Sequence, residues 1–277
     1  MAKIALDAGH GLYTPGKRCL KKLDKRETRE WIINDRVTDA LELYLKLAGH
    51  SVLRVDDWDD GHTDVTLNDR VRKANNWKAD AYISVHHNAG INGGSGGGTV
   101  VYVSKGCQAK SIKLQEAVYK RVIVRGKLKG NRSDGTLSAN FYVIRKTKMP
   151  AILIECGFMD SAVDIKHILD TDWSEQVGLG IAEGVCEVFG GSISDQKPSK
   201  PSPKPDKPVG KSFLVRVKID LNIRKGPGAE FKKEGCIKDK GTYTIVQTAK
   251  AKDGGTWGKL KSGAGWINIG SKYVKRL

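Results

Sequence analysis

The chain has 277 residues, of which 39% are hydrophobic and 29% are charged, and its formal net charge is +17 at pH 7. No apolar stretch is long enough to cross a membrane as a helix, which argues against a membrane-spanning protein. The cysteines number 5 and show no paired spacing, which indicates free thiols in a reducing compartment rather than a disulfide framework.

Short apolar runs with strand-like composition are each followed by a polar side chain. The runs are residues 2–6, 81–85 and 151–154, and the polar residues that follow them are His10, His86 and Glu155, in that order. Glycines beside His10 let the backbone turn sharply there. We therefore expect three strands, each with a polar group at its carboxyl end.

Between the first two strands, residues 33–47 repeat apolar side chains with helical spacing, and Gly49 marks the end of the helix. Glu30 extends the apolar stripe backwards by one turn and should face inward. Strands that alternate with helices predict an α/β fold, with a mostly parallel twisted sheet flanked by helices. Sites in such sheets gather at the carboxyl ends of the strands, where three of these four residues are expected.

This residue set suggests a zinc ion with a carboxylate beside it. Zinc takes nitrogen and carboxylate ligands, and two histidines with one glutamate leave a position for water. The metal lowers the pKa of that water towards about 7. We assign the metal-binding role to His10, Glu30 and His86, and the proton-accepting role in attack on a carbonyl to Glu155.

Each residue also has a structural interpretation when it is taken alone. Glu27 lies one turn before Glu30 and competes with it, and either carboxylate could simply favour the start of a helix. His86 and His87 alternate to opposite sides of a strand, so at most one of them should bind the metal. Glu155 closes an apolar strand and must be either paired or functional.

The motifs resemble those of the zinc-dependent N-acetylmuramoyl-L-alanine amidases of the amidase 3 family, found in bacterial autolysins and phage endolysins. The resemblance runs from residue 3 to about residue 189. The matching segments are residues 7–11, Glu30 with Asn34, residues 70–75, residues 84–89 and residues 140–160. The resemblance favours Glu30 over Glu27, selects His86 rather than His87, and places Glu155 as the catalytic glutamate.

The resemblance implies hydrolysis of the amide between N-acetylmuramic acid and the L-alanine of the peptidoglycan stem. The residues alone indicate only zinc-assisted amide hydrolysis, and they leave the substrate-binding residues unknown. The chain departs from the family at residues 131–135, which are longer than the usual pattern, and at His87, where a small residue is usual. His87 could support the site or contact substrate, or it could simply be exposed.

The C-terminal part is set off by residues 191–211, which hold five of the 8 prolines among lysines and serines. This composition predicts an extended spacer between a catalytic domain at residues 1–190 and a small domain at residues 212–277. In the small domain, short β-rich runs alternate with glycine turns, and its motifs resemble bacterial SH3 domains, small all-β barrels that attach wall hydrolases to the wall. Trp257 and Trp266 there could be core residues or ligand contacts.

The positive charge is concentrated in the last quarter of the chain. From residue 212 onward there are 15 basic and 5 acidic residues, and residues 191–211 add a further +3. This excess suggests attraction to peptidoglycan and anionic wall polymers. Nucleic acid is also anionic, but no zinc-finger spacing or recognition-helix pattern is present, so we do not expect nucleic-acid binding.

Two further functions remain open from sequence: a zinc peptidase that cuts within the stem peptide or cross-bridge, and a wall-binding protein that keeps the fold without catalysis. Residues 1–3 lead directly into the first strand without a visible signal peptide. A wall hydrolase of this kind resembles a phage endolysin, held in the host bacterial cytoplasm until the membrane is opened. The sequence does not indicate an oligomeric state.

Overall fold

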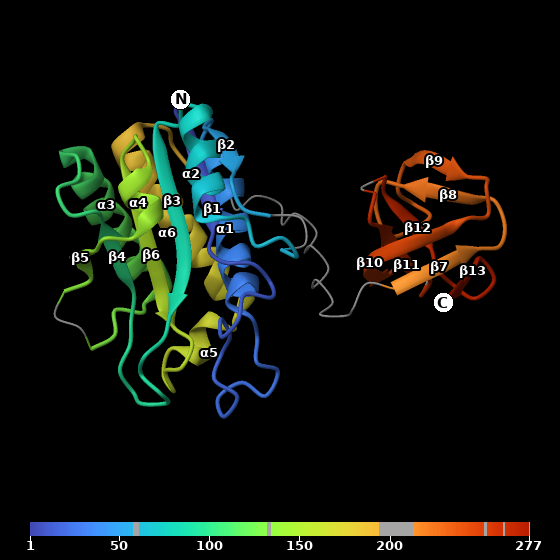
Figure 1. Ribbon diagram of the computed structural model, residues 1–277, viewed down its shortest axis with the longest axis horizontal. Coiled ribbons are helices and arrows are strands. Elements are labelled where there is room, and N and C mark those ends of the chain that lie inside the picture. Colours follow the sequence, from blue (N-terminus) through green and yellow to red (C-terminus); the bar gives the residue numbers. More distant parts are fainter. Residues whose placement is uncertain (58–60, 132–133, 194–212, 252–253, 263, 277) are drawn as a thin grey trace. The chain divides into compact units, whose positions relative to one another are not determined.

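The computed structural model describes residues 1–57, 61–131, 134–193, 213–251, 254–262 and 264–276 (Figure 1). The chain divides into two compact units, Met1–Asp195 and Gln196–Leu277. Most of the expected spacer, residues 194–211, lies outside the described residues.

The N-terminal unit is built on one six-stranded sheet with strand order β2-β1-β3-β6-β4-β5. The strands are β1 (Lys3–Ala8), β2 (Ser51–Arg54), β3 (Ala81–Asn88), β4 (Val100–Val103), β5 (Thr136–Ser138) and β6 (Ala151–Phe158). The four strands β2, β1, β3 and β6 are mutually parallel, as predicted. β4 runs antiparallel to β6 and parallel to β5, so the sheet is mixed rather than wholly parallel.

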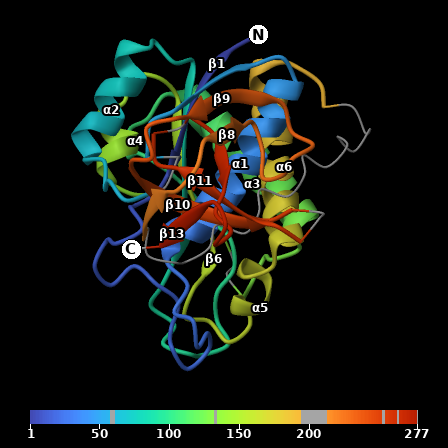
Figure 2. The ribbon, with the colours of Figure 1, turned by 90° about the vertical axis from the view of Figure 1, so that its right-hand side faces the viewer.

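Helices cover both faces of this sheet, which confirms the predicted α/β architecture (Figures 1 and 2). The helices are α1 (Glu30–Leu47), α2 (Leu67–Asn76), α3 (Ala109–Gly126), α4 (Tyr142–Lys146), α5 (Ile165–Ile168) and α6 (Thr171–Phe189). The larger core lies between the sheet and the α1, α3 and α6 layer, and the smaller one lies under α2 and α4. Successive side chains of a strand point to opposite faces of the sheet, so Ile83 packs in the larger core and Tyr82 in the smaller one.

Two strands are longer than the apolar runs suggested. β3 continues through His86 to Asn88, and β6 continues through Glu155 to Phe158. Backbone pairing between these two strands continues past the apolar residues, with His86 as the register partner of Glu155. Both residues therefore lie within the sheet, near its carboxyl edge, rather than in the loops that follow.

The C-terminal unit is all β, and every strand pairing in its described part is antiparallel, with order β13-β7-β10-β11-β12-β8-β9. Its strands are β7 (Phe213–Val217), β8 (Leu221–Arg224), β9 (Lys233–Ile237), β10 (Thr242–Lys250), β11 (Thr256–Leu260), β12 (Trp266–Asn268) and β13 (Val274–Arg276). Its apolar core includes Val215, Ile245 and Ile267. Trp257 and Trp266 are both buried and pack with Ala251, which fits the core interpretation of these tryptophans.

All five cysteines are free, including Cys156, which is buried beside Glu155. Within the described ranges, no helix has both the length and the apolar character needed to span a membrane.

Candidate metal centre

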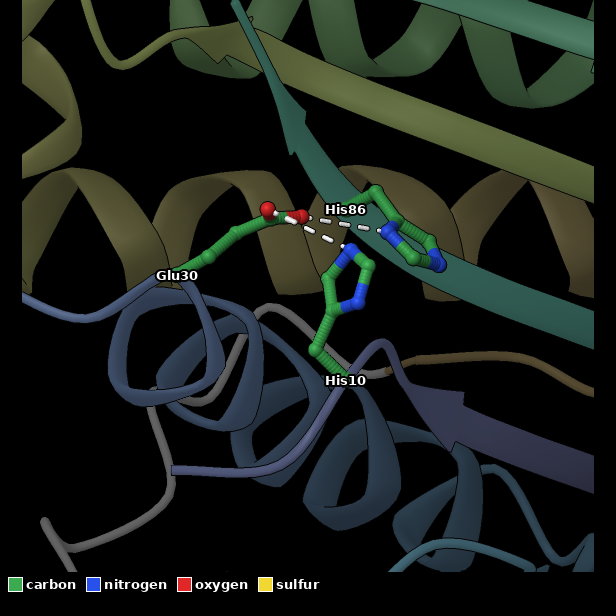
Figure 3. Close-up of side chains that lie close together, drawn as sticks. All are labelled: His10, Glu30 and His86. Carbon is green, nitrogen blue, oxygen red and sulfur yellow. Dashed lines mark hydrogen bonds and ion pairs between the residues drawn. The ribbon is translucent and has the colours of Figure 1, made fainter. Parts of the chain in front are cut away.

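His10, Glu30 and His86 converge at the carboxyl edge of the sheet (Figure 3). Their ligand atoms all lie within 4.8 Å of one another. His10 Nε2 is 3.3 Å from Glu30 Oε2, and His86 Nδ1 is 3.1 Å from Glu30 Oε1. Three segments that are far apart in sequence thus bring two imidazoles and one carboxylate to a single point.

Adjacent parallel strands bring the two histidines together. His10 follows β1, and His86 lies near the end of β3, which pairs directly with β1. A Cβ on Gly9 would stand 2.0 Å from Cε1 of His86, so this position must be glycine for the His86 ring to pack there. The rings of His10 and His86 meet edge to face with their centroids 4.9 Å apart.

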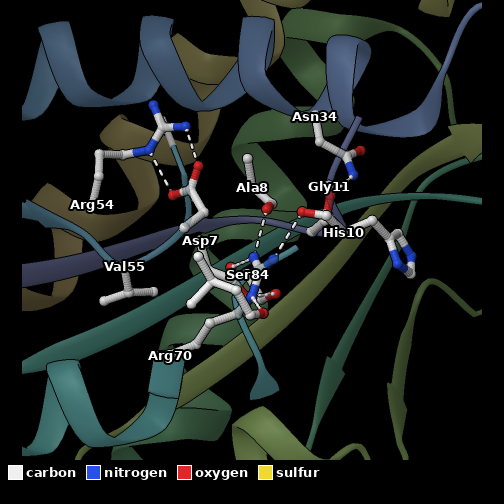
Figure 4. A network of polar contacts seen from close by, with 12 residues as sticks. Asp7, Ala8, His10, Gly11, Asn34, Arg54, Val55, Arg70 and Ser84 are labelled. Atoms are coloured by element: carbon white, nitrogen blue, oxygen red, sulfur yellow. Dashed lines mark hydrogen bonds and ion pairs between the residues drawn. The ribbon is translucent and has the colours of Figure 1, made fainter. Parts of the chain in front are cut away.

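Arg70, from α2, holds the turn that carries His10 (Figure 4). Its guanidinium donates hydrogen bonds to the carbonyl oxygens of Ala8 and His10, both at 2.8 Å, and forms a buried ion pair with Asp7. Burial alone would raise the pKa of Asp7, but Arg70 and the hydrogen bonds outweigh it, and this pKa lies below its ordinary value. The Arg70 motif noted in the sequence therefore supports the backbone of the site.

Glu30 occupies the first turn of α1 and is 1% exposed, facing inward as its place in the helical stripe predicted. Burial raises its pKa, but the close contacts with the His10 and His86 rings outweigh burial and lower the pKa well below its ordinary value. Glu30 is therefore an ionised, buried carboxylate. Glu27 points elsewhere, because its carboxylate pairs with Arg18 at 3.3 Å and with Lys21.

Glu155 stands beside this cluster on β6, in register with His86. Its Oε2 atom is buried and has no hydrogen-bond partner among the described residues. Burial raises the pKa of Glu155 to about 7, against an ordinary value of 4.5. A carboxyl group with this pKa can exchange a proton near neutral pH, which a structural carboxylate does not need to do.

These residues line one cavity of about 290 Å³, whose walls also include Lys17, Asn88 and Met159. Lys17 was not singled out in the sequence. Its Nζ lies 4.0 Å from Glu30 Oε2, although its side chain is 45% exposed. Nothing local distinguishes this lysine from the other basic residues of the chain, and only the fold brings it to the cavity.

His87 is not exposed, which rules out one of the two interpretations made from sequence. It is 2% exposed, and its Nδ1 lies 2.8 Å from Asn34 Oδ1 on α1. Burial lowers the pKa of His87 to about 3, so its ring is neutral. His86 and His87 therefore have different neighbours, as their alternation along the strand predicted.

The donor set fits a metal ion of the zinc type. Two imidazole nitrogens and one carboxylate are typical ligands of a site that keeps a further position open. Glu30 Oε2 accepts no hydrogen bond within the described part of the chain, although it is buried. Burial lowers the pKa of His86, yet Glu30 and Glu155 outweigh it and raise that pKa, so the site favours an added positive charge.

Known proteins share this N-terminal unit. The endolysin of Bacillus phage SPP1 is 30% identical over 290 residues, an alignment that covers 99% of this chain and 98% of that protein. The sporulation-specific N-acetylmuramoyl-L-alanine amidase of Bacillus subtilis (strain 168) is 32% identical over 191 residues, covering 68% of this chain and 69% of that protein. A solved structure with the same fold is the catalytic domain of CwlV, an N-acetylmuramoyl-L-alanine amidase from Bacillus (Paenibacillus) polymyxa var. colistinus. It aligns with a TM-score of 0.61 and 28% identity, and the alignment covers 69% of this chain and 100% of that domain. Residues 4–187 match the model of the N-acetylmuramoyl-L-alanine amidase family, and the chain belongs to that family.

Proposed function

We propose that the N-terminal unit binds zinc through His10, Glu30 and His86 and uses Glu155 as the proton acceptor in amide hydrolysis. Family membership gives the reaction, cleavage of the bond between N-acetylmuramic acid and L-alanine in peptidoglycan. The proposal adds the metal and the role of each residue. The observation that carries it is the convergence of three ligand groups beside a buried carboxyl oxygen of Glu155 that accepts no hydrogen bond from any described residue.

A bound zinc ion would supply Lewis acidity, which makes water more acidic and polarises a carbonyl group. The part that Glu155 plays follows from its surroundings. Among the residues that the structure describes, no donor bonds its Oε2, so this oxygen is available to accept a proton from the attacking water. The same carboxyl can then deliver that proton to the nitrogen of the departing L-alanine, because its pKa lies near neutral pH.

Mass analysis of digested peptidoglycan tests the reaction. Purified walls treated with the protein should gain free L-alanine amino termini, and a chelator should prevent this until zinc is added back. New termini elsewhere in the stem peptide or cross-bridge would indicate a zinc peptidase instead. Unchanged walls with zinc-loaded protein would indicate a protein that binds walls without cleaving them.

The proposal extends to the C-terminal unit. Residues 212–277 would form a bacterial SH3-type domain that attaches the enzyme to peptidoglycan and anionic wall polymers, with residues 191–211 as the spacer. The separate β core and the 15 basic against 5 acidic residues of this part support the assignment. Retention on purified walls, compared with retention on DNA at the same salt concentration, distinguishes a wall ligand from nucleic acid.

The biological role we propose is that of a phage endolysin, which stays in the host cytoplasm until the membrane is opened. Similarity to the endolysin of phage SPP1 over 99% of this chain supports this role. Cells that express the protein should remain intact, and they should lyse promptly when the membrane is permeabilised. Lysis without permeabilisation would contradict the proposed route to the wall.

A further inference from the structure

The two carboxylate oxygens of Glu30 have different surroundings. Oε1 lies 3.3 Å from the backbone nitrogen of His87 and 3.4 Å from Nδ2 of Asn34, and it accepts a hydrogen bond from each. Oε2 is in ion-pair contact with His10 but accepts no hydrogen bond within the described residues. Oε1 is thus held by the His87 backbone N–H and the Asn34 amide and also lies 3.1 Å from Nδ1 of His86, whereas Oε2 has neither of those two donors.

The orientation of the Asn34 amide follows from its neighbours. Nδ2 lies 3.0 Å from the carbonyl oxygen of Gly9 and 3.4 Å from Oε1 of Glu30, and both of these atoms can only accept. Oδ1 must therefore face His87, whose Nδ1 is 2.8 Å away. Since an amide oxygen cannot donate, the His87 ring must donate this hydrogen bond, and its hydrogen resides on Nδ1.

This tautomer also agrees with the burial of the ring. His87 Nε2 is buried without a partner among the described residues. With the hydrogen on Nδ1, the atom left without a partner is an acceptor and not an N–H donor. Buried donors without a partner are the rarer case in proteins.

We propose that His87 and Asn34 are positioning residues for the metal ligands. The His87 ring fixes the Asn34 amide, and that amide, with the His87 backbone N–H, holds Oε1 of Glu30 so that Oε2 is presented to the metal. The same amide binds the carbonyl oxygen of Gly9, directly before His10, and so ties two ligand segments together. This inference rests on the proposed metal site and concerns residues that do not themselves bind the ion.

Zinc affinity is the measurement that separates positioning from mere packing. Residues that orient metal ligands typically contribute about 10–100-fold in affinity. We expect His87→Leu and Asn34→Leu to weaken zinc binding by about this factor. The affinity is measured by titrating the metal-free protein with zinc in the presence of a competing chelator. His87→Asn should restore affinity to within a few-fold of the unaltered protein, because its amide nitrogen is placed as Nδ1 is. His87→Gln carries its amide one bond further out and should not restore it.

His50 provides a matched control. It is also a buried histidine, 5% exposed, with Nδ1 accepting from the backbone nitrogen of Ala2 and Nε2 facing the carbonyl oxygen of Gly190 at 2.9 Å. His50→Leu should lower the thermal stability of the metal-free protein and leave zinc affinity unchanged. If His50→Leu weakens zinc binding as much as His87→Leu, or if His87→Asn and His87→Gln behave alike, the positioning role is wrong.

A spectrum of the unaltered, metal-free protein tests the geometry without any substitution. Nitrogen-15 NMR should find the hydrogen of His87 on Nδ1 and that of His50 on Nε2. A hydrogen on Nε2 of His87 would overturn the proposal even if every variant failed to fold. Failure of the metal site itself is a distinct outcome, since the unaltered protein would then bind no zinc while the His87 tautomer remained as described.

Discussion

Arg70 donates a hydrogen bond of 2.8 Å from Nη2 to the backbone carbonyl oxygen of His10. His10 has a φ of +66°, a left-handed conformation that non-glycine residues seldom adopt. The side chain from α2 therefore stabilises the strained turn that directs the His10 imidazole toward Glu30. Strain of this kind persists only where the surrounding structure enforces it.

Arg70→Lys should be strongly destabilising. Lysine lacks the planar guanidinium group, and its ammonium cannot bond to the Asp7 carboxylate and to the carbonyl oxygens of Ala8 and His10 at the same time. Lysine keeps a positive charge opposite Asp7, so the loss comes from buried carbonyl oxygens left without a donor, at about 1–3 kcal/mol for each, and denaturant unfolding should show a loss of this order. Arg72→Lys on the same helix is the control, since Arg72 is 61% exposed and pairs with Asp69 at the surface. Its effect should be below about 1 kcal/mol, and equal losses in the two variants would contradict the role of Arg70.

Glu155→Gln should separate catalysis from metal binding. The amide keeps the size of the side chain but cannot accept the proton, so hydrolysis of peptidoglycan should fall by about 10²–10⁴-fold. Zinc content, measured by atomic absorption, should match that of the unaltered protein, because Glu155 is not among the converging ligands. Turnover close to normal would remove Glu155 from the mechanism.

Loss of a ligand should reduce metal content and activity together. We expect this of His10→Ala, His86→Ala and Glu30→Ala. Glu27→Ala is the matched control, because its carboxylate pairs with Arg18 and Lys21 instead. Full zinc occupancy in any of the three ligand variants would require a different ligand set.

The raised pKa of Glu155 predicts a pH dependence of stability in the metal-free protein. Between pH 4.5, its ordinary pKa, and about pH 7, its folded-state pKa, the folded protein keeps a proton that the unfolded chain has lost. The contribution of this group to stability is therefore complete below pH 4.5 and is lost as the pH rises to about 7. Each pKa unit corresponds to about 1.4 kcal/mol.

Comparison with Glu155→Gln isolates this contribution, since glutamine does not titrate. Urea unfolding of the two metal-free proteins should show the variant gaining stability relative to the unaltered protein as the pH rises from 4.5 to 7.5. A constant difference across this range would mean that Glu155 is not a buried carboxyl group with a raised pKa.

The sequence predicted the elements that carry the site better than it predicted their surroundings. His10, His86 and Glu155 follow or end apolar runs, and parallel strands bring such ends to one edge of a sheet. The helical stripe predicted correctly that Glu30 faces inward. Periodicity says nothing about strand direction, however, and so the antiparallel placement of β4 (Val100–Val103) was not anticipated.

Other features depend on contacts between distant segments. Arg70 lies sixty residues after His10 and bonds to its carbonyl oxygen. The motif that contains Arg70 is visible in the sequence, but the atoms that its side chain binds are not. The burial of His87 depends on α1 and α6, where Asn34 bonds its ring and Trp173 lies with its ring centroid 6.3 Å away. The position of Lys17 is set by a loop with no periodic pattern. These relationships belong to tertiary packing and leave no local signature.

Removal of residues 191–277 should affect attachment more than chemistry. The N-terminal unit has its own cores, and the charge excess lies in the removed part. Binding to whole walls, measured by co-sedimentation, should fall strongly, while cleavage of small soluble fragments should change little. Equal losses on both substrates would argue against a separate binding domain.

The central claim is that His10, Glu30 and His86 hold one zinc ion beside Glu155. Anomalous X-ray scattering at the zinc absorption edge, from crystals grown with zinc, tests this most directly. The account predicts one strong peak in the N-terminal unit within bonding distance of those three side chains, with Glu155 close by but not coordinating. A peak at other residues, or no peak at this site under saturating zinc, would contradict it.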